Sequence, residues 1–315
     1  MDKFKKGLLG LKDQLSFKSI KFSNLKDLKN MKPNAIVIIG MGGSGQVGDL
    51  IAGLKKELNI PVPIIVWKDR GLPKIDHTDP LFLFISFSGN TEETLSGFKK
   101  AKNKAVICSG GKLLKMAERE NSPIAYFSNP GIKPRQGGGF MFYGALGILK
   151  NIFPKIKTPK IELSDKEKEG ASMAKKISGK IALIYGSQKN NYLCYNWKTR
   201  LNETPKNPAF CGTIPEICHN EIEIFENKKL SSKMLIIFIE DDSDNESIIN
   251  TIKKLKRVFK KNGAAFISVG LKGKNELDRA WNALSLADWV GYYLAKMNKA
   301  DPSKTDLIDK LKSLK

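Results

Sequence analysis

Short apolar runs alternate with helical patterns along most of this chain, and this alternation limits the possible fold. In the first half, apolar runs of strand length lie at 35–39, 62–67, 81–86, 105–108 and 124–127. Helical patterns follow these runs. The first comes after the glycine-rich turn that follows 35–39 and ends near residue 58, and the others cover 92–102, 113–121 and 140–152. Alternating strands and helices form parallel sheets with helices on both faces. The first half is therefore predicted to be an α/β unit.

The second half repeats this pattern. Its predicted strands are 181–185, 234–239 and 264–269, and its predicted helices are 191–203, 247–262, 277–296 and, after a proline turn, 301–314. A chain of 315 residues is long for one hydrophobic core and suits two domains. The segment 153–168, rich in Pro, Lys and acidic residues, marks the expected boundary. The prediction is an α/β protein of two tandem three-layer αβα units with parallel sheets, residues 1–153 and 154–315.

The net charge of +22 needs an interpretation. One hypothesis is nucleic-acid binding, which basic proteins often show. Here the positive charges are nearly all lysines, are spread along the whole chain and are mixed with acidic residues. There is no arginine cluster, zinc finger or basic arm with interleaved aromatic residues. We therefore expect no nucleic-acid partner, although the field favours a small anionic ligand.

Membrane and metal chemistry find little support in the sequence. No apolar run approaches the roughly 18 residues of a membrane span, and the basic N-terminus lacks the apolar run of a signal peptide. The four cysteines (Cys108, Cys194, Cys211 and Cys218) form no CxxC pair and no metal-ligand spacing. We expect a cytoplasmic protein with reduced thiols, no metal site and no cofactor.

The first glycine-rich turn, GMGGSG at 40–45, follows a predicted strand and precedes a predicted helix. It fits the GxGxxG dinucleotide fingerprint, and Asp69 follows the next strand. A nicotinamide-dependent oxidoreductase is therefore one hypothesis, although a single motif match is weak. More generally, glycines let backbone N–H groups approach an anion at a helix N-terminus. A tight turn without a ligand is the alternative.

A second turn, ISFSGNTEET at 85–94, places three hydroxyl groups at the carboxyl end of a predicted strand. Ser86, Ser88 and Thr91 are suited to donate hydrogen bonds to phosphate oxygens beside free helix N–H groups. Helix capping is the alternative, because Asn90 and Glu93 have the spacing of a capping box. Capping explains one or two of these residues and not the whole run. The turn therefore predicts a phosphate site and argues against a dinucleotide fold.

A third turn, PRQGGG at 134–139, contains one of the few arginines of the chain, Arg135. Its guanidinium group is suited to hold a phosphate or a sugar hydroxyl beside slim glycine backbone. The alternative is a surface arginine on a flexible loop, and composition alone does not separate the two.

The segment 201–226, LNETPKNPAFCGTIPEICHNEIEIFE, contains one of the two histidines of the chain. His219 lies in sequence near several carboxylates (Glu203, Glu216, Glu221 and Glu223), which is the combination that proton transfer at neutral pH needs. The alternative role for His219 is structural. Glu203 ends a predicted helix, whereas Glu216 follows a proline and has a structural alternative. His77 lies in a polar turn and is expected at the surface.

At this point the chain resembles a known family. GMGGSG, SFSGNTEET and the Pro-Arg before a glycine-rich helix start resemble a sugar isomerase (SIS) domain. NETPKNPAF, the following Pro-Glu and HNEIEIFE resemble the bifunctional phosphoglucose/phosphomannose isomerase family, in the same order and over nearly the whole chain. The resemblance implies a double SIS fold and a homodimer whose active sites are shared between subunits.

The same resemblance implies roles for individual residues. The sugar phosphate would be bound by Gly43, Ser44, Ser86, Ser88 and Thr91. Arg135 would stabilise the enediolate, and Glu203 would move the proton between C1 and C2. His219 of the partner subunit would open the sugar ring, assisted by a lysine that matches Lys296 in DWVGYYLAK. For Lys296 the alternative is a lysine that complements the dipole of its helix end.

The sequence also departs from the family pattern at three places. Thr204-Pro205 stands where a small, Asn-containing pair is usual, three glycines follow Arg135, and Phe225 replaces a common tryptophan. None of these removes a chemical group that the reaction needs. The predicted function is metal-independent interconversion of glucose 6-phosphate and mannose 6-phosphate with fructose 6-phosphate. A non-catalytic SIS-domain sensor of sugar phosphates is the alternative, although no DNA-binding module is visible.

Overall fold

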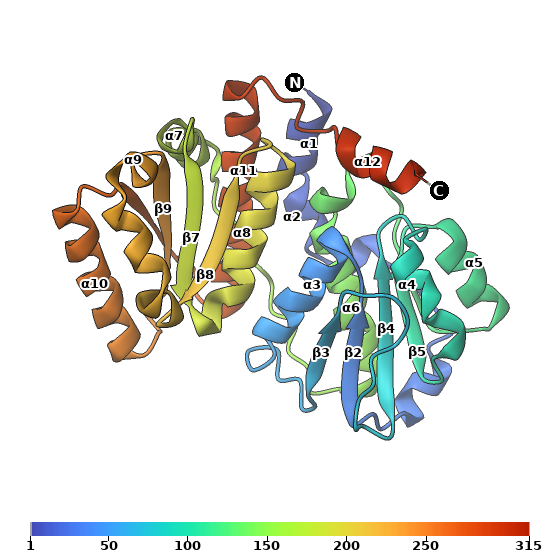
Figure 1. Cartoon of the computed structure of the whole chain (residues 1–315). Coiled ribbons are helices and arrows are strands. Elements are labelled where there is room, and N and C mark those ends of the chain that lie inside the picture. Colours follow the sequence, from blue (N-terminus) through green and yellow to red (C-terminus); the bar gives the residue numbers. More distant parts are fainter. Residues whose placement is uncertain (1, 315) are drawn as a thin grey trace. The chain divides into compact units, whose positions relative to one another are not determined.

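The computed structural model describes residues 2–314, and the chain divides into two compact units between Ile161 and Glu162. Figure 1 shows both units and labels their helices and most of their strands. The division falls within the segment 153–168, which is rich in proline, lysine and acidic residues. Within residues 2–314, no helix combines the length and the apolarity that a membrane span needs.

The first unit contains one sheet, formed among its described residues by β1 (Lys21–Ser23), β2 (Ala35–Ile39), β3 (Ile64–Trp67), β4 (Pro80–Ser86), β5 (Lys104–Cys108) and β6 (Ile124–Tyr126). The strand order is β1-β6-β5-β4-β2-β3. Strands β2 to β6 are parallel, and β1 pairs antiparallel with β6. Strand β1, which has three residues and polar ends, was not predicted from the sequence.

Helices cover both faces of this sheet. They are α1 (Lys3–Leu9), α2 (Leu11–Gln14), α3 (Gly42–Gly53), α4 (Glu92–Ser96), α5 (Gly111–Arg119) and α6 (Gly138–Ile152), with 3-10 turns η1 (Phe17–Ser19), η2 (Lys26–Asn30), η3 (Phe98–Lys100) and η4 (Pro134–Gln136). On one face, Gly48 of α3 approaches Ile38, and Gly144 of α6 approaches Ile107. On the other face, Phe84 packs in one cluster with residues of η3 and α5. Successive side chains of a strand point to opposite faces of the sheet. Strands such as β2 are apolar at successive positions, so they present apolar side chains to the helices on both faces.

The second unit has a parallel sheet. Its described strands are β7 (Ile181–Ser187), β8 (Ala209–Ile214), β9 (Met234–Glu240) and β10 (Phe266–Gly270), in the order β10-β9-β7-β8. Its helices are α7 (Glu167–Ile177), α8 (Asn191–Glu203), α9 (Lys228–Ser231), α10 (Glu246–Lys261), α11 (Glu276–Met297) and α12 (Asp306–Ser313), with 3-10 turns η5 (Gln188–Asn190), η6 (Glu216–His219) and η7 (Glu221–Glu226).

The two faces of this second sheet are covered by different segments. On one face, Gly186 of β7 leaves room for Cys194 of α8, and α8 packs on α11. On the other face, Tyr185 and Phe238 join one buried cluster with residues of η6, η7 and α10. In this cluster the ring centroids of Phe225 and Phe259 are 4.6 Å apart. The phenyl ring at 225, a departure from the family pattern, thus belongs to the core of the unit.

The predicted α/β class with two mainly parallel sheets is confirmed, and α8 has the predicted bounds. The predicted helix 92–102 was wrong, because α4 ends at Ser96 and a 3-10 turn follows. Gly97, between the two, packs closely against another loop, since a Cβ atom there would lie 2.8 Å from Gly71 O. Strand β8 and helix α7 were not predicted.

Candidate functional site

The sugar-phosphate residues predicted in the first unit follow the carboxyl ends of β2 and β4. From β2 the chain leads to β3 at one side, and from β4 it leads to β5 and β6 at the other. Open parallel sheets bind ligands at such a change of direction, in the crevice outside the carboxyl ends of the strands. The turn at 40–45 and the hydroxyl-rich turn at 85–94 therefore lie at the expected ligand position of this sheet.

The glycines of the turn at 40–45 allow its backbone to pack closely against neighbouring backbone. A Cβ atom on Gly40 would lie 2.9 Å from Ile85 O, and one on Gly45 would lie 2.5 Å from Gly40 O. Ser44 is buried, and its Oγ accepts a hydrogen bond from the N–H of Phe87 at 3.2 Å. This bond joins the first turn directly to the second.

The second turn holds two of its three hydroxyl groups together. Ser86 Oγ and Thr91 Oγ1 are 3.1 Å apart, and Ser86 Oγ also accepts from the N–H of Gly89 at 3.1 Å. Ser88 is exposed, and its Oγ accepts from the N–H of Asn90. The hydroxyl hydrogen of Ser88 therefore stays available to an outside acceptor, as an anion-binding turn requires.

The capping alternative for this turn was wrong. Helix α4 begins after Thr91, and no side chain caps its N-terminus. The Oδ1 atom of Asn90 instead accepts from the N–H of Lys112 at 3.0 Å. Asn90 thus ties the turn to the start of α5, and the hydroxyl groups are not explained as helix caps.

Arg135 lies in η4, directly beside the first turn. A Cβ atom on Gly43 would lie 3.2 Å from the Cα atom of Arg135. The Arg135 guanidinium carbon lies 5.4 Å from the centroid of the Phe4 ring, a geometry that allows a cation–π contact. Arg135 is half-buried, so the hypothesis of a surface arginine on a flexible loop does not fit.

Two of the three glycines after Arg135, Gly137 and Gly139, have a packing explanation. Gly137 lies against the ring of Phe87, so closely that a Cβ atom there would overlap the ring. A Cβ atom on Gly139 would lie 2.6 Å from Cβ of Gln14. The third turn therefore packs against the second at Gly137, and it packs against the first at Gly43. The structure brings together the loops that hold all six substrate residues predicted in this unit: Gly43, Ser44, Ser86, Ser88, Thr91 and Arg135.

Gly89 offers a direct test of this interlocking. Its φ is +66°, and an added Cβ atom would overlap Gly110 O. We expect Gly89→Ala to lower the free energy of unfolding by about 3 kcal/mol or more, because both strain and overlap oppose it. Gly71→Ala is the matched control, since Gly71 has a φ of +72° but open space around it. Its expected cost is about 1 kcal/mol. Urea unfolding of the two variants measures the difference, and equal losses would contradict the role of the Gly110 contact.

In the second unit, Glu203 is the last residue of α8 and is half-buried. A network fixes the turn that follows. Lys206, with a φ of +56°, donates from Nζ to the carbonyl oxygens of Glu203 and Thr204, and to those of Asp301 and Lys304. The glutamate is thus presented by a turn that is hydrogen-bonded to the start of the C-terminal segment.

Two asparagines fix the other side of this turn. Asn202 donates to the carbonyl oxygens of Asn207 and Ala209, and Asn207 donates to that of Lys180. Lys180 precedes β7 and Ala209 begins β8, so Glu203 lies near the amino ends of these strands. Sequence reasoning missed the positioning roles of Lys206 and of both asparagines. The NETPKNP motif contained the signal, because asparagines beside prolines are typical of hydrogen-bonded turns.

Lys296 lies in the last turn of α11, and its Nζ is 4.4 Å from the centroid of the Tyr292 ring. The end of α11 is close to the Glu203 turn, because Asn298 donates from Nδ2 to Pro205 O at 2.9 Å. The structure therefore brings the helix end that contains Lys296 beside the segment that contains Glu203. The lysine also has the position that complements a helix dipole, as the alternative hypothesis states.

His219 is exposed and lies apart from Glu203 in this unit. It ends η6, which follows the carboxyl end of β8, whereas Glu203 lies near its amino end. The six residues of β8 span about 20 Å. The segments also cover opposite faces of the sheet, α8 on one and η6 with η7 on the other. Their proximity in sequence therefore does not reflect proximity in the fold.

Of the acidic residues near His219, Glu221 has a structural role. Its Oε2 atom accepts from the hydroxyl of Tyr185 at 2.8 Å. Burial raises the pKa of Tyr185 well above its usual value, and the hydrogen bond and charge of Glu221 raise it further. Glu216 is exposed and accepts from Asn220 at 3.0 Å. Neither glutamate faces the turn that contains Glu203.

The second sheet also changes direction between β7 and β9, but protein side chains fill this place. Lys189 pairs with Asp241 at 3.1 Å and with Glu276 at 3.2 Å. Asn190 and Ser243 donate further hydrogen bonds to Asp241. Burial opposes the charge of Asp241, but these hydrogen bonds outweigh it and lower its pKa to about 2. Within residues 2–314, no group of His, Cys, Asp and Glu side chains is arranged to hold a metal ion.

This buried carboxylate predicts a pH dependence of stability. A folded pKa of about 2 against roughly 3.9 when unfolded means that ionised Asp241 stabilises the fold above about pH 4. That contribution, roughly 2 kcal/mol, is lost as the pH falls from 4 to 2. The neighbouring Asp244 acts in the opposite direction, because burial and the charge of Asp241 raise its pKa. Asp241→Asn should therefore unfold with a flatter dependence on pH between 4 and 2 in urea titrations. An unchanged slope would contradict this contribution.

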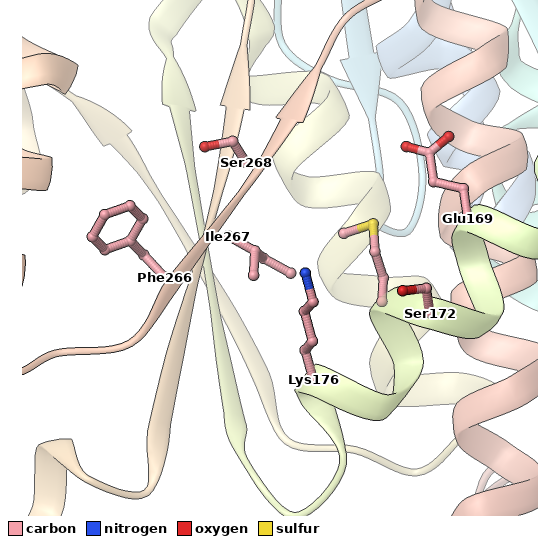
Figure 2. A pocket seen from close by; sticks show the side chains of 7 residues that line it. Glu169, Ser172, Lys176, Phe266, Ile267 and Ser268 are labelled. Carbon is pink, nitrogen blue, oxygen red and sulfur yellow. The ribbon is translucent and has the colours of Figure 1, made fainter.

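A separate pocket of about 450 Å³ lies between α7 and the edge strand β10. Figure 2 shows Glu169, Ser172 and Lys176 of α7 on one side and Phe266, Ile267 and Ser268 of β10 on the other. None of the predicted site residues lines it. This pocket therefore does not belong to the candidate site.

Comparison with known proteins identifies the family. A family model described as bacterial phospho-glucose isomerase C-terminal SIS domain matches residues 166–314. The bifunctional phosphoglucose/phosphomannose isomerase of Aquifex aeolicus is 32% identical over 295 residues, which cover 91% of each chain. The chain belongs to the bifunctional phosphoglucose/phosphomannose isomerase family. It is thus a sugar-phosphate isomerase of that family.

Two further relatives and one solved structure are also similar to this member of the phosphoglucose/phosphomannose isomerase family. The family's enzyme from Thermoplasma volcanium is 32% identical over 98% of each chain. A D-glucosamine-6-phosphate 4-epimerase of Sulfolobus acidocaldarius is 28% identical over 78% of this chain and 84% of that protein. The SIS fold is shared with the C-terminal domain of glucosamine-fructose-6-phosphate aminotransferase from Francisella tularensis, with a TM-score of 0.66, 15% identity and coverage of 96% and 98%.

Proposed function

We propose that this isomerase interconverts glucose 6-phosphate and fructose 6-phosphate, and that it also accepts mannose 6-phosphate. The observation that supports this most is the interlocking of three turns at the change of direction of the first sheet. They gather hydroxyl groups, glycine backbone and an arginine, which suits a phosphorylated sugar. The names of the relatives from Aquifex aeolicus and Thermoplasma volcanium support the same substrates.

The phosphate would serve as an anchor remote from the reacting carbons. Ser86, Ser88 and Thr91 would donate to its oxygens, with Gly43 and Ser44 at the adjoining turn. Binding energy from this end would orient C1 and C2 for proton transfer. The rigid contacts between the turns favour such orientation, because they leave little freedom for the loops to move separately.

The chemical step would use Glu203 as the base. Its carboxylate would take the proton from C2 of the open-chain aldose, and the electron pair of the broken bond would form the enediolate, with the negative charge on O1. Arg135 would stabilise that charge. Glu203 would return the proton to C1, and transfer of the O2 hydroxyl proton to O1 would give the ketose. His219 and Lys296 would assist the preceding ring opening as acid and base.

The active site would require two copies of the chain. Glu203 and His219 lie at different ends and on different faces of the second sheet, so one copy of this unit does not pair them. We propose a homodimer in which His219 of the partner subunit completes each site. Helix α12 adds support, because it exposes Leu307, Ile308 and Leu311. An uncovered apolar surface of this kind is typical of protein interfaces.

A coupled assay with glucose 6-phosphate and mannose 6-phosphate, each with and without a chelator, tests this function. We expect turnover of both substrates and no loss on chelation. Loss of activity with the chelator would overturn the metal-independent route. Tight binding of fructose 6-phosphate without any turnover would instead support a non-catalytic sensor.

One relative favours a second candidate function, epimerisation of a sugar phosphate. The Sulfolobus acidocaldarius protein that matches 78% of this chain is named as an epimerase that acts on D-glucosamine 6-phosphate. Proton NMR of a reaction with D-glucosamine 6-phosphate separates the two functions. Inversion at C4 would favour the epimerase, whereas aldose–ketose exchange with hexose 6-phosphates alone would favour the isomerase.

A further inference from the structure

A cavity of about 640 Å³ lies in the first unit, outside the turns already described. Its walls come from α1, α2, the loop before η4 and the first turn of α6. It is lined by Lys3, Lys6, Gly7, Gly10, Asp13, Gln14, Pro130, Gly131, Ile132 and Phe140. Its volume is within the range of roughly 300–1,000 Å³ that small-molecule sites occupy. None of the predicted substrate residues lines it.

Gln14 is a buried polar residue in the wall of this cavity. The residue is 2% exposed, and its Nε2 donates to Gln136 O at 2.9 Å. This bond fixes the orientation of the amide, because a flipped side chain would place two oxygens against each other. The other amide atom, Oε1, is buried and has no hydrogen-bond partner among the described residues. Because this oxygen is also closed to solvent, the polar groups that meet a ligand are the exposed side chains of the wall, Lys3, Lys6 and Asp13.

The remaining walls divide into a cationic part and an apolar part. Lys3 and Lys6 are exposed residues on α1, and their ammonium groups suit a phosphate. Ile132 and Phe140 give apolar contact area, and Phe140 is buried. Asp13 lies at the same cavity and suits a ligand hydroxyl or amino group. With one carboxylate against two ammonium groups, the charged lining stays net positive.

We propose that this cavity binds a nucleoside monophosphate. The phosphate pairs with Lys3 and Lys6, the heterocyclic base packs on the apolar wall, and an amino group of the base or a hydroxyl of the ribose donates to Asp13. A sugar phosphate would leave the apolar wall unused, and an uncharged nucleoside would leave the lysines unpaired. The cavity is thus distinct in chemistry from the hydroxyl-lined turns of the proposed substrate site.

Calorimetric titration with adenosine monophosphate tests the proposal. Saturating fructose 6-phosphate is present throughout, so that binding at the substrate turns does not contribute. We expect one site per chain, and affinities about tenfold or more weaker for adenosine and for inorganic phosphate. The Lys3→Ala/Lys6→Ala double variant should lose about tenfold or more in affinity. Lys12→Ala is the matched control, because Lys12 is exposed on α2 and does not line the cavity.

Gly10→Leu tests the location by filling the cavity. Gly10 has a φ of −75°, and the atoms nearest to an added Cβ would lie 3.5 Å and 3.7 Å away, so the backbone accepts a side chain there. We expect this variant to lose adenosine monophosphate binding while its thermal unfolding stays near that of the parent. If it does not fold, the double lysine variant decides alone. Absence of binding at millimolar nucleotide, displacement by fructose 6-phosphate, or unchanged affinity in the lysine variant would each overturn the proposal.

Discussion

Replacing Glu203 by glutamine is expected to lower kcat by about 10³-fold or more, while binding of fructose 6-phosphate stays nearly unchanged. The amide has the shape of the carboxylate but does not accept a proton, so the variant retains the pocket and loses the base. The turn should also survive, because Lys206 bonds to the backbone oxygen of Glu203. Steady-state kinetics and calorimetric titration of the same preparation measure the two effects separately.

Glu223→Gln is the matched control for this experiment. Glu223 is exposed in the segment 221–226 and belongs to the same cluster of acidic residues in the sequence. Its replacement should change kcat by less than about twofold, because it has no proposed part in the reaction. Near-normal turnover by Glu203→Gln would remove Glu203 as the base. Equal losses in both variants would point to a general charge effect.

Mixing two inactive variants should restore activity, if sites are shared between subunits. Glu203→Gln and His219→Asn would be unfolded together and refolded at equal concentration. Half of the dimers then contain one copy of each variant, and in these one of the two sites has both native residues. We therefore expect about a quarter of the parent activity, although each variant alone is nearly inactive. The reason is the placement of Glu203 and His219 on different faces of one sheet.

The control is a mixture of two variants on the same side of the proposed site. Glu203→Gln with Arg135→Gln should give no restoration, because both residues would come from one copy and His219 from the other. Size-exclusion chromatography with light scattering shows whether dimers form in each mixture. Dimers without restored activity in the first mixture would contradict the shared site, as would a monomeric protein with full activity.

Much of the fold could be predicted from local patterns. Helix α8 has the predicted bounds because its helical pattern ends at Glu203, just before Pro205. Strand β8 was missed because AFCGTI lacks a clear alternation of apolar and polar residues. Helix α4 was predicted too long, and the glycine after it, Gly97, packs against Gly71, a residue distant in sequence. Local patterns do not contain such contacts.

In the candidate site, too, local features could be predicted and contacts between distant residues could not. The hydroxyl groups of Ser86 and Thr91 were recognised from type and spacing, because a phosphate site needs donors at a strand end. The packing of Gly137 against Phe87 was not foreseen, since it joins residues 50 positions apart. The separation of Glu203 from His219 by the sheet was equally hidden, although the family resemblance had implied that they serve different sites.

The fitted glycines of the first unit limit how relatives of this protein can acquire new substrates. A side chain at Gly40, Gly45 or Gly137 would displace a neighbouring strand end or turn, so single mutations that reshape the proposed phosphate site should be eliminated by loss of folding. The exposed His219 and the turn after Glu203 are less constrained. Evolutionary changes in the sugar or in the carbon attacked should therefore accumulate in the second unit, while the turns of the proposed phosphate site are inherited with little change.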